Sequence, residues 1–302
     1  MTDSDVTGDT TDLSVAGFGA RLAAAMAARG PLCAGIDPHP GLLRDWGLAD
    51  DIGGLERFAL GAAEALAPEV AVLKPQSAFF ERHGAQGMAV LERVLHLVRD
   101  AGALVLLDVK RGDIGSTMTG YAEAFLAEDA PLGADAITVS PYLGVGALEP
   151  AFELASRTGR GVFVLALTSN PEGADVQSAR TGNGATVAQS VIDAVAARNL
   201  GYQGLGDLGV VIGATSAPAA VRLEALGGPV LAPGIGAQGA TLADLHRVFG
   251  AAVRHVLPAI SRELLRHGPV SATLRSAARR VADEAAAVLV PPSWQVEGGT
   301  PR

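Results

Sequence analysis

Eight short, almost wholly apolar runs recur along this chain, and amphipathic stretches fill several of the gaps between them. Strands of such composition are buried on both faces, as in a parallel sheet. Their alternation with helical stretches indicates βαβ crossovers. Eight such units predict an α/β fold of the (β/α)8 TIM barrel type. The runs are residues 31–37, 70–75, 103–110, 136–143, 161–169, 208–215, 229–236 and 255–261.

The helical stretches fit the same architecture. A doubly wound open sheet is the structural alternative, but the segment after its first strand would carry G-x-G-x-x-G, and here it reads GIDPHPG. One helix is expected before the first strand and one after the last. The predicted helices are residues 16–30, 55–67, 87–102, 186–199, 217–227 and 271–290.

Length and composition favour a single domain. A chain of 302 residues with 49% hydrophobic but only 4% aromatic residues supports a large aliphatic core. Residues 1–13 are polar and acidic and are expected to be disordered, and residues 291–302 form a short mixed tail. Since no linker interrupts the rest, the barrel domain is expected over residues 14–290.

Charge and cysteine content exclude several classes of protein. A net charge of −9 without a basic run argues against nucleic-acid binding. Cys33 is the only cysteine, so an intrachain disulfide and a cysteine-based metal site are excluded, and the histidines form no ligand-like cluster. The first residues are not a signal peptide, and no apolar run reaches the ~18 residues that span a bilayer. We therefore expect a cytoplasmic protein with no metal and no membrane association.

Charged residues stand at the ends of the second and third runs. Asp108 and Lys110 lie two apart on one predicted strand, so their side chains should share a face, and Lys74 ends the neighbouring strand. In a barrel, the carboxyl ends of the strands meet at the mouth that holds the active site. Alternating opposite charges keep both lysines protonated, and a protonated lysine can serve as a general acid.

Two points about this cluster stay open at the level of the residues. A structural ion network that caps the barrel is the alternative to a catalytic site. Asp113 follows in RGDIGST, past the strand end. Either a tight loop at Gly112 turns Asp113 back toward Lys110, or Asp113 reaches the site of a neighbouring subunit.

A phosphate site is predicted after the last two strands. The segment LAPGIGAQGA at 231–240 supplies a glycine-rich turn whose backbone N–H groups can bind an anion. The eighth run ends in Ser261 and Arg262, and an arginine fork suits phosphate. Barrels often bind phosphate at this position. The polar, glycine-rich segment 167–184 after the fifth strand is expected to be a mobile lid, with a surface loop of no role as the alternative.

Together these motifs resemble orotidine 5′-phosphate decarboxylases. The resemblance covers roughly residues 31–265, and LKPQSAFFE is similar to the longer, type 2 subgroup, which has KPQxAFFE after its second strand. The related sugar-phosphate decarboxylases and synthases share D-x-K-x-x-D alone. The motifs that carry the resemblance are GIDP (35–38), LKPQSAFFE (73–81), LLDVKRGDIGST (106–117), LTSNPEG (167–173), GATS (213–216), PGIGAQG (233–239) and ISRELL (260–265).

The resemblance implies a role for each matching residue. The catalytic chain would be Lys74, Asp108, Lys110 and, from the other subunit of a homodimer, Asp113. Thr117 would also come from the partner subunit, near the ribose. The remaining substrate contacts would be Asp37 to a ribose hydroxyl, Ser169 to the pyrimidine, Gln177 from the lid, and Gly234, Gly236 and Arg262 to the phosphate.

The implied reaction is decarboxylation of orotidine 5′-phosphate to UMP in de novo pyrimidine biosynthesis, without a cofactor. Fixed positive charge would stabilise a carbanion at C6, and Lys110 would protonate it. One alternative is a metal-dependent sugar-phosphate decarboxylase or synthase of the same barrel superfamily. That enzyme would need acidic metal ligands on the second strand, where this chain has Lys74. The other alternative is a non-catalytic binder of phosphate ligands.

Overall fold

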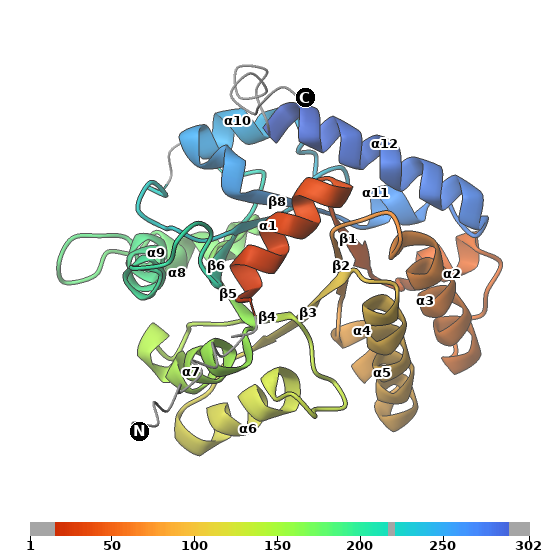
Figure 1. Cartoon of the computed structure of the whole chain (residues 1–302), viewed down its shortest axis with the longest axis horizontal. Helices are drawn as coiled ribbons and strands as arrows, with labels where there is room; N and C mark the ends of the chain where they lie inside the picture. Colours follow the sequence, from red (N-terminus) through yellow and green to blue (C-terminus); the bar gives the residue numbers. More distant parts are fainter. Residues whose placement is uncertain (1–15, 217–220, 290–302) are drawn as a thin grey trace, which may run out of the picture.

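The computed structural model describes residues 16–216 and 221–289, and in them eight parallel strands close into one barrel. Each strand pairs with the next in sequence, and β8 pairs with β1 (Figure 1). The predicted (β/α)8 barrel is therefore confirmed. The strands are β1 (Cys33–Ile36), β2 (Val72–Pro75), β3 (Leu104–Arg111), β4 (Ala136–Val139), β5 (Gly161–Leu167), β6 (Leu208–Ile212), β7 (Val230–Pro233) and β8 (Val256–Ile260).

Helices surround the strands and cover their outer faces (Figure 1). The longer ones are α1 (Phe18–Arg29), α3 (Ile52–Leu66), α5 (Gly84–Asp100), α6 (Gly115–Leu126), α7 (Glu149–Thr158), α9 (Val187–Arg198) and α12 (Ser271–Leu289). Short ones are α2 (Pro40–Asp45), α4 (Ala78–Glu81), α8 (Ala174–Gln177), α10 (Asp244–Phe249) and α11 (Arg262–Leu265). Three 3-10 turns complete the set, η1 (Val145–Leu148), η2 (Pro171–Gly173) and η3 (Gly250–His255).

Alternation along the strands divides the core into two layers. On β4, Ala136 belongs to the inner cluster of the barrel, whereas Ile137 and Val139 pack in the outer layer under the helices. The inner layer is aliphatic except for Cys33, Phe163 and Phe18, in keeping with the low aromatic content of the chain. The side chains that follow this inner layer toward the carboxyl ends of the strands are the ones that reach the mouth.

Helix α1 closes the amino-terminal end of the barrel. The ring of Phe18 meets that of Phe163 edge to face at 5.8 Å. A Cβ atom on Gly161, at the start of β5, would lie 2.3 Å from Phe18, so only glycine admits the helix at this distance. Asp207 fixes the helix start by accepting a hydrogen bond from the backbone N–H of Gly19 at 2.7 Å. Helix α1 thus plugs the interior of the barrel at this end.

The predicted helices are confirmed except for the stretch 217–227. Residues 221–227, its described part, form bends and turns. Side chains of α9 and the residue after it satisfy this backbone instead: Gln189 hydrogen-bonds both the N–H and the C=O of Arg222, and Asn199 donates to the C=O of Leu226. Tertiary contacts thus replace the helical ladder. The expected disordered start (1–13) and tail (291–302) lie outside the described residues.

Candidate active site

A cavity of about 350 Å³ opens at the carboxyl ends of the strands. A smaller hollow of about 120 Å³ adjoins it beside β7 and β8 and shares Asp37, Lys74 and Gln238 with it. The two hollows together form an elongated site with acidic and basic groups at one end and a glycine-rich loop at the other. The charged and polar residues that line the larger cavity include Asp37, Lys74, Gln76, Asp108, Lys110 and Thr138.

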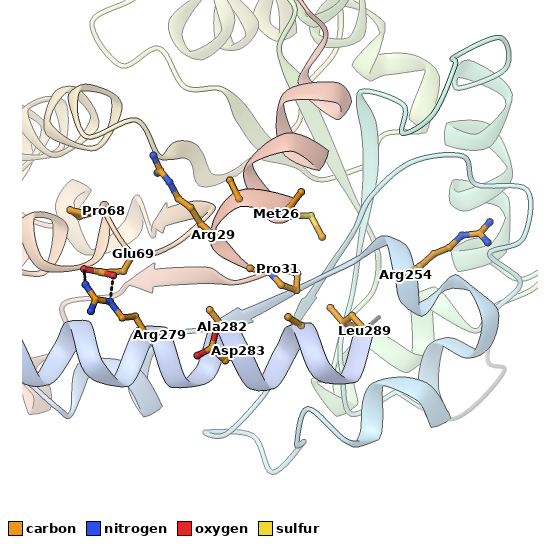
Figure 2. A pocket seen from close by; sticks show the side chains of 14 residues that line it. Met26, Arg29, Pro31, Pro68, Glu69, Arg254, Arg279, Ala282, Asp283 and Leu289 are labelled. Atoms are coloured by element: carbon orange, nitrogen blue, oxygen red, sulfur yellow. Dashed lines mark hydrogen bonds and ion pairs between the residues drawn. The ribbon is translucent and has the colours of Figure 1, made fainter. Parts of the chain in front are cut away.

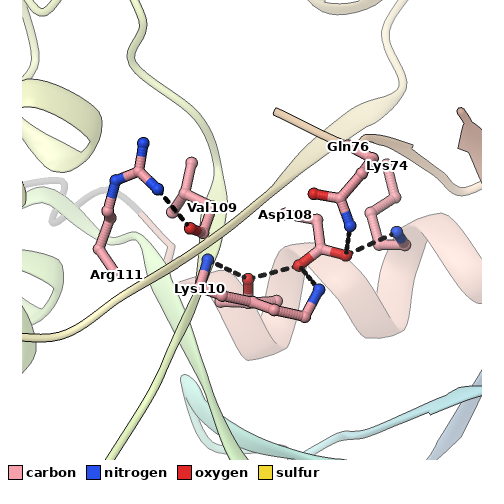
Figure 3. A network of polar contacts seen from close by, with 7 residues as sticks. Lys74, Gln76, Asp108, Val109, Lys110 and Arg111 are labelled. Atoms are coloured by element: carbon pink, nitrogen blue, oxygen red, sulfur yellow. Dashed lines mark hydrogen bonds and ion pairs between the residues drawn. The ribbon is translucent and has the colours of Figure 1, made fainter. Parts of the chain in front are cut away.

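The carboxylate of Asp108 is the centre of the polar network at this mouth (Figure 3). Its Oδ1 accepts hydrogen bonds from Nζ of Lys110 at 2.6 Å and from the hydroxyl of Thr138 at 2.7 Å. Its Oδ2 accepts from Nζ of Lys74 at 3.0 Å and from Nε2 of Gln76 at 2.9 Å. Two ammonium groups share one carboxylate, so these three charged side chains carry a net positive charge beside the cavity.

Burial and charge act in opposite directions on this cluster. Burial favours the neutral form of Lys74, but attraction to Asp108 and then Asp37 outweighs it and holds the pKa of Lys74 above its ordinary value. Burial likewise favours the neutral form of Asp108. The charges of Lys74 and Lys110, with hydrogen bonds from Lys110 and Thr138, outweigh it and hold the pKa of Asp108 below its ordinary value. At neutral pH both groups are therefore ionised.

The backbone of Lys110 adopts a left-handed conformation, with φ of 46°. Among the described residues it is the one non-glycine with a positive φ. Such a conformation costs about 1–3 kcal/mol and persists only where the surroundings enforce it. The register between β3 and β4 shifts between Leu107 and Arg111, so Lys110 lies in an irregular strand end. The expected meeting of Asp108 and Lys110 is confirmed, but a bulge rather than simple alternation brings it about.

The glycine-rich loop after β7 approaches the start of α11. Gly234 and Gly236 have φ of 103° and 76°, conformations that favour glycine. A Cβ on Gly234 would lie 2.7 Å from Oε1 of Gln238, and one on Gly236 would lie 2.9 Å from Cβ of Glu263. Gly234, Ser261 and Arg262 line the smaller hollow. The structure therefore brings Gly234 and Arg262, two of the three predicted phosphate contacts, to one side of the site, whereas Gly236 lies beside Glu263 and does not line the hollow.

Two buried polar atoms face this region without a protein partner. Within residues 16–216 and 221–289, Oδ1 of Asp37 and Oγ of Ser261 are buried and make no hydrogen bond. Buried polar atoms normally have a partner, and an unpaired one lowers stability. Asp37 follows β1 and Ser261 follows β8, on neighbouring strands. Both atoms lie in residues that line the smaller hollow.

The two residues predicted on the loop after β5, Ser169 and Gln177, make different contacts. The hydroxyl of Ser169 donates to Oε1 of Gln238 at 2.7 Å, and both residues line the larger cavity. Gln177 instead binds Thr168: its Nε2 donates to Oγ1 at 2.7 Å and its Oε1 accepts from the backbone N–H at 2.9 Å. It lines a neighbouring apolar hollow of about 400 Å³. Gln177 thus braces the loop in this conformation.

Asp113 and Thr117 lie outside the cavity that the other predicted residues line. The carboxylate of Asp113 accepts a hydrogen bond from the backbone N–H of Ile114 at 2.8 Å, whereas the ammonium group of Lys110 pairs with Asp108. Of the two possibilities for Asp113, the return toward Lys110 within one chain is therefore not the one observed. A Cβ on Gly112 would lie 2.3 Å from the C=O of Ser140, so this glycine permits close packing of the strand ends.

A larger hollow of about 720 Å³ lies at the opposite end of the barrel, between α1 and α12 (Figure 2). Pro31, Pro68 and Arg254, which precede β1, β2 and β8, help to line it. Glu69 and Arg279 pair there through two contacts of 2.5 and 2.7 Å. Because barrel enzymes react at the carboxyl ends of the strands, we place the active site at the mouth with Asp108.

Three residues of the site were not predicted from the sequence. Gln76 and Thr138 both hydrogen-bond Asp108, and Gln238 links the two hollows. Gln76 and Gln238 stand within motifs that the sequence analysis singles out. One feature of the sequence could have identified Thr138. It is polar and lies two residues after Ala136, on the inward face of an otherwise apolar strand.

This fold and this site define a (β/α)8-barrel enzyme with a Lys–Asp–Lys cluster beside a glycine-rich loop. The model of the orotidine 5′-phosphate decarboxylase / HUMPS family matches residues 30–277, and the chain belongs to this family. Among the described residues, no helix is long and apolar enough to cross a membrane.

Similar proteins cover nearly the whole chain. Orotidine 5′-phosphate decarboxylase of Salinispora arenicola is 62% identical over 272 residues, which cover 90% of this chain and 98% of that protein. The enzyme of Streptomyces coelicolor is 60% identical over 267 residues, 88% of this chain and 96% of the relative. A crystal structure from Streptomyces avermitilis, assigned as an orotidine 5′-phosphate decarboxylase, has a TM-score of 0.90 at 58% identity and covers 92% of this chain and 98% of its own.

Proposed function

We propose that this protein decarboxylates orotidine 5′-phosphate to UMP and CO2 in de novo pyrimidine biosynthesis. The observation that carries the proposal is the buried Asp108 carboxylate held between two lysines at the mouth of the barrel, in a chain of this family. As this reaction belongs to nucleotide synthesis, we place it in the cytoplasm.

The proposed chemistry requires no electron sink. The bond from C6 to the carboxylate carbon breaks, CO2 leaves, and the electron pair stays on C6 in the plane of the ring. The ammonium group of Lys110, 45% exposed at the side chain, faces the cavity and stabilises this charge before donating a proton to C6. The product is UMP, and Lys110 recovers its proton from solvent. Asp108 and Lys74 hold the ammonium group in place before the substrate binds.

The rest of the substrate would lie along the elongated site. Gly234, Gly236 and Arg262 would bind the phosphate, and the carboxylate of Asp37, which lines both hollows, would accept a hydrogen bond from a ribose hydroxyl. Ser169 would contact the pyrimidine. Phosphate binding lies far from C6, so its energy can order the loop at 167–184 and exclude water without touching the reacting bond.

We further propose a homodimer in which Asp113 and Thr117 complete the partner's site. Both residues lie outside this chain's own cavity, and between them, just before α6, the large apolar side chain of Ile114 is 62% exposed. Tyr142, on the loop after β4, is exposed to 80%. Exposed apolar side chains around a polar mouth are typical of a subunit interface.

A spectroscopic assay with orotidine 5′-phosphate, with and without a metal chelator, tests the proposal. We expect UMP formation that the chelator leaves unchanged. The metal-dependent alternative needs acidic ligands at the end of β2, where the side chain is the ammonium of Lys74, and no group of three or more His, Cys, Asp or Glu within the described ranges could hold a metal ion. Loss of turnover with chelator would favour that alternative, and uridine phosphate binding without turnover would favour a non-catalytic binder.

A further inference from the structure

Thr138 is the one polar side chain that β4 directs into the barrel. It follows Ala136 by two residues on the inward face and is 1% exposed. A hydroxyl in such a place must be hydrogen-bonded, because an unpaired buried hydroxyl lowers stability. Its two partners come from the same neighbouring strand, and both belong to the proposed catalytic machinery.

The hydroxyl of Thr138 has a fixed direction. It donates its single proton to Oδ1 of Asp108 at 2.7 Å, which leaves a lone pair to accept the backbone N–H of Lys110 at 3.0 Å. The oxygen of Asp108 that it binds is the one that also accepts from Nζ of Lys110. Thr138 therefore contacts Lys110 at the backbone and, through Asp108, at the ammonium group.

The backbone contact lies where β3 departs from regular pairing. Leu106 and Leu107 pair with Ala136 and Ile137, but the next pair is Arg111 with Val139. The extra residues of β3 lie opposite Thr138, and the N–H of Lys110 finds its partner in a side chain rather than in the ladder. This contact holds Lys110 in the left-handed conformation that aims its side chain at the cavity.

We propose that Thr138 is a positioning residue for proton transfer: its hydroxyl fixes both the backbone of Lys110 and the carboxylate that anchors the Lys110 ammonium group. This inference rests on the proposed role of Lys110 as proton donor. A donor displaced by about 1 Å from its productive position can lose about 100-fold in rate. Thr138 itself need not touch the substrate, because both its hydrogen bonds are made within the protein.

Two complementary variants test the inference. Thr138→Val keeps the branched shape and removes the hydroxyl, whereas Thr138→Ser keeps the hydroxyl and removes the methyl group. We expect Thr138→Val to lower kcat by about 10- to 100-fold, with KM changed by less than about threefold, and Thr138→Ser to stay within about threefold of wild type. Values of kcat are taken per site that binds UMP, so that a fall in folded protein does not count as a fall in rate.

A crystal structure of Thr138→Val gives a readout that does not depend on activity. We expect the left-handed φ of Lys110 to be lost, or its Nζ to move away from Oδ1 of Asp108. An unchanged Lys110, or wild-type kcat in Thr138→Val, overturns the inference. Equal losses in the Val and Ser variants overturn it as well, since they would assign the effect to packing.

Failure of the proposed function gives a different pattern. The proposed function is wrong if the wild-type protein does not decarboxylate orotidine 5′-phosphate or if Lys110→Ala stays active. The crystal structure of Thr138→Val still decides whether Thr138 holds Lys110. If Thr138→Val does not fold, Thr138→Ala removes the same hydroxyl without adding a methyl group beside the carboxylate, and the same outcomes apply to it.

Discussion

The ammonium nitrogen of Lys110 lies 2.6 Å from Oδ1 of Asp108, on a carboxylate whose other oxygen Lys74 already holds. Lys74 is buried and satisfies the charge balance of Asp108 by itself, whereas the side chain of Lys110 is 45% exposed toward the cavity. The second lysine is thus the one placed to act on a substrate. This asymmetry leads to distinct predictions for Lys110 and Asp108.

Replacing Lys110 should separate chemistry from fold. We expect Lys110→Ala to lower kcat by at least about 1,000-fold, because it removes both the proton donor and the charge beside C6. UMP binding should persist. Lys110→Gly should be equally inactive but about 1 kcal/mol more stable than the alanine variant, because glycine tolerates the left-handed backbone. Turnover assays measure the loss of activity, and urea unfolding measures the difference in stability between the two variants. Ordinary turnover in either variant would contradict the proposed role of Lys110 as proton donor.

Replacing Asp108 should reverse the pH dependence of stability. In the wild-type protein the pKa of Asp108 is lowered, so its contribution is present above the unfolded value of 3.8 and is lost as the pH falls through the folded pKa. The pKa of Lys74 is raised, so its contribution is present below 10.5 and is lost as the pH rises through the folded pKa. Between these limits the pair contributes a constant amount.

In Asp108→Asn, burial acts on Lys74 without its main partner, so its folded pKa should fall below the unfolded value. The unfolded state then binds more protons, and the free energy of unfolding should rise between about pH 6 and about pH 10. At neutral pH the variant should be about 3–5 kcal/mol less stable than wild type. Urea unfolding at a series of pH values measures this. Asp50→Asn, which removes a surface partner of Arg82, is the control and should show no such slope; a flat profile in Asp108→Asn contradicts the prediction.

The sequence was sufficient to predict the barrel and the centre of the site. The eight apolar runs predict the barrel, because each must be buried on both faces. The ends of the second and third strands then place Lys74, Asp108 and Lys110 together. Thr138 and Gln76 escaped prediction because their contacts depend on the register of neighbouring strands, and the β3–β4 register shifts at the site itself. A regular strand model has no bulge and therefore gives no reason for the left-handed Lys110.

The helix predicted over residues 217–227 is absent from the described part, 221–227, for a related reason. Its composition favours a helix, but Gln189 and Asn199 satisfy its backbone from another part of the chain. Local propensity is a weak guide where tertiary hydrogen bonds compete with it. The contacts of Gln177 could not be predicted either. The same loop sequence allows its side chain to hydrogen-bond within the loop or to contact a ligand.

Two glycines in the loop after β7 should differ although their backbones are alike. Gly234 and Gly239 have φ of 103° and 91°, but a Cβ meets Gln238 only at Gly234. Gly234→Ala should therefore displace Gln238, break its hydrogen bond with Ser169 and raise KM by about tenfold. Gly239→Ala should show the backbone cost alone, about 1 kcal/mol of stability, with a smaller change in KM. Steady-state kinetics compare the two, and equal KM values would contradict a role for Gln238.

The shared site predicts that two inactive variants restore each other. In a mixed dimer of Asp113→Ala and Lys110→Ala subunits, one site receives Lys110 from the first chain and Asp113 from the second, and the other site lacks both. A dimer purified through two different tags should therefore show about half the wild-type activity, although each parent is inactive.

A mixed dimer of Asp113→Ala and Thr117→Ala is the matched control. Both residues are proposed to act across the interface, so each site in this dimer lacks one of them and no intact site forms. The control should remain no more active than the better of its parents. No recovery in the first pair would place Asp113 within its own subunit's site, which would require the loop that carries Asp113 to turn toward Lys110. Recovery in the control would show instead that only one of Asp113 and Thr117 acts across the interface.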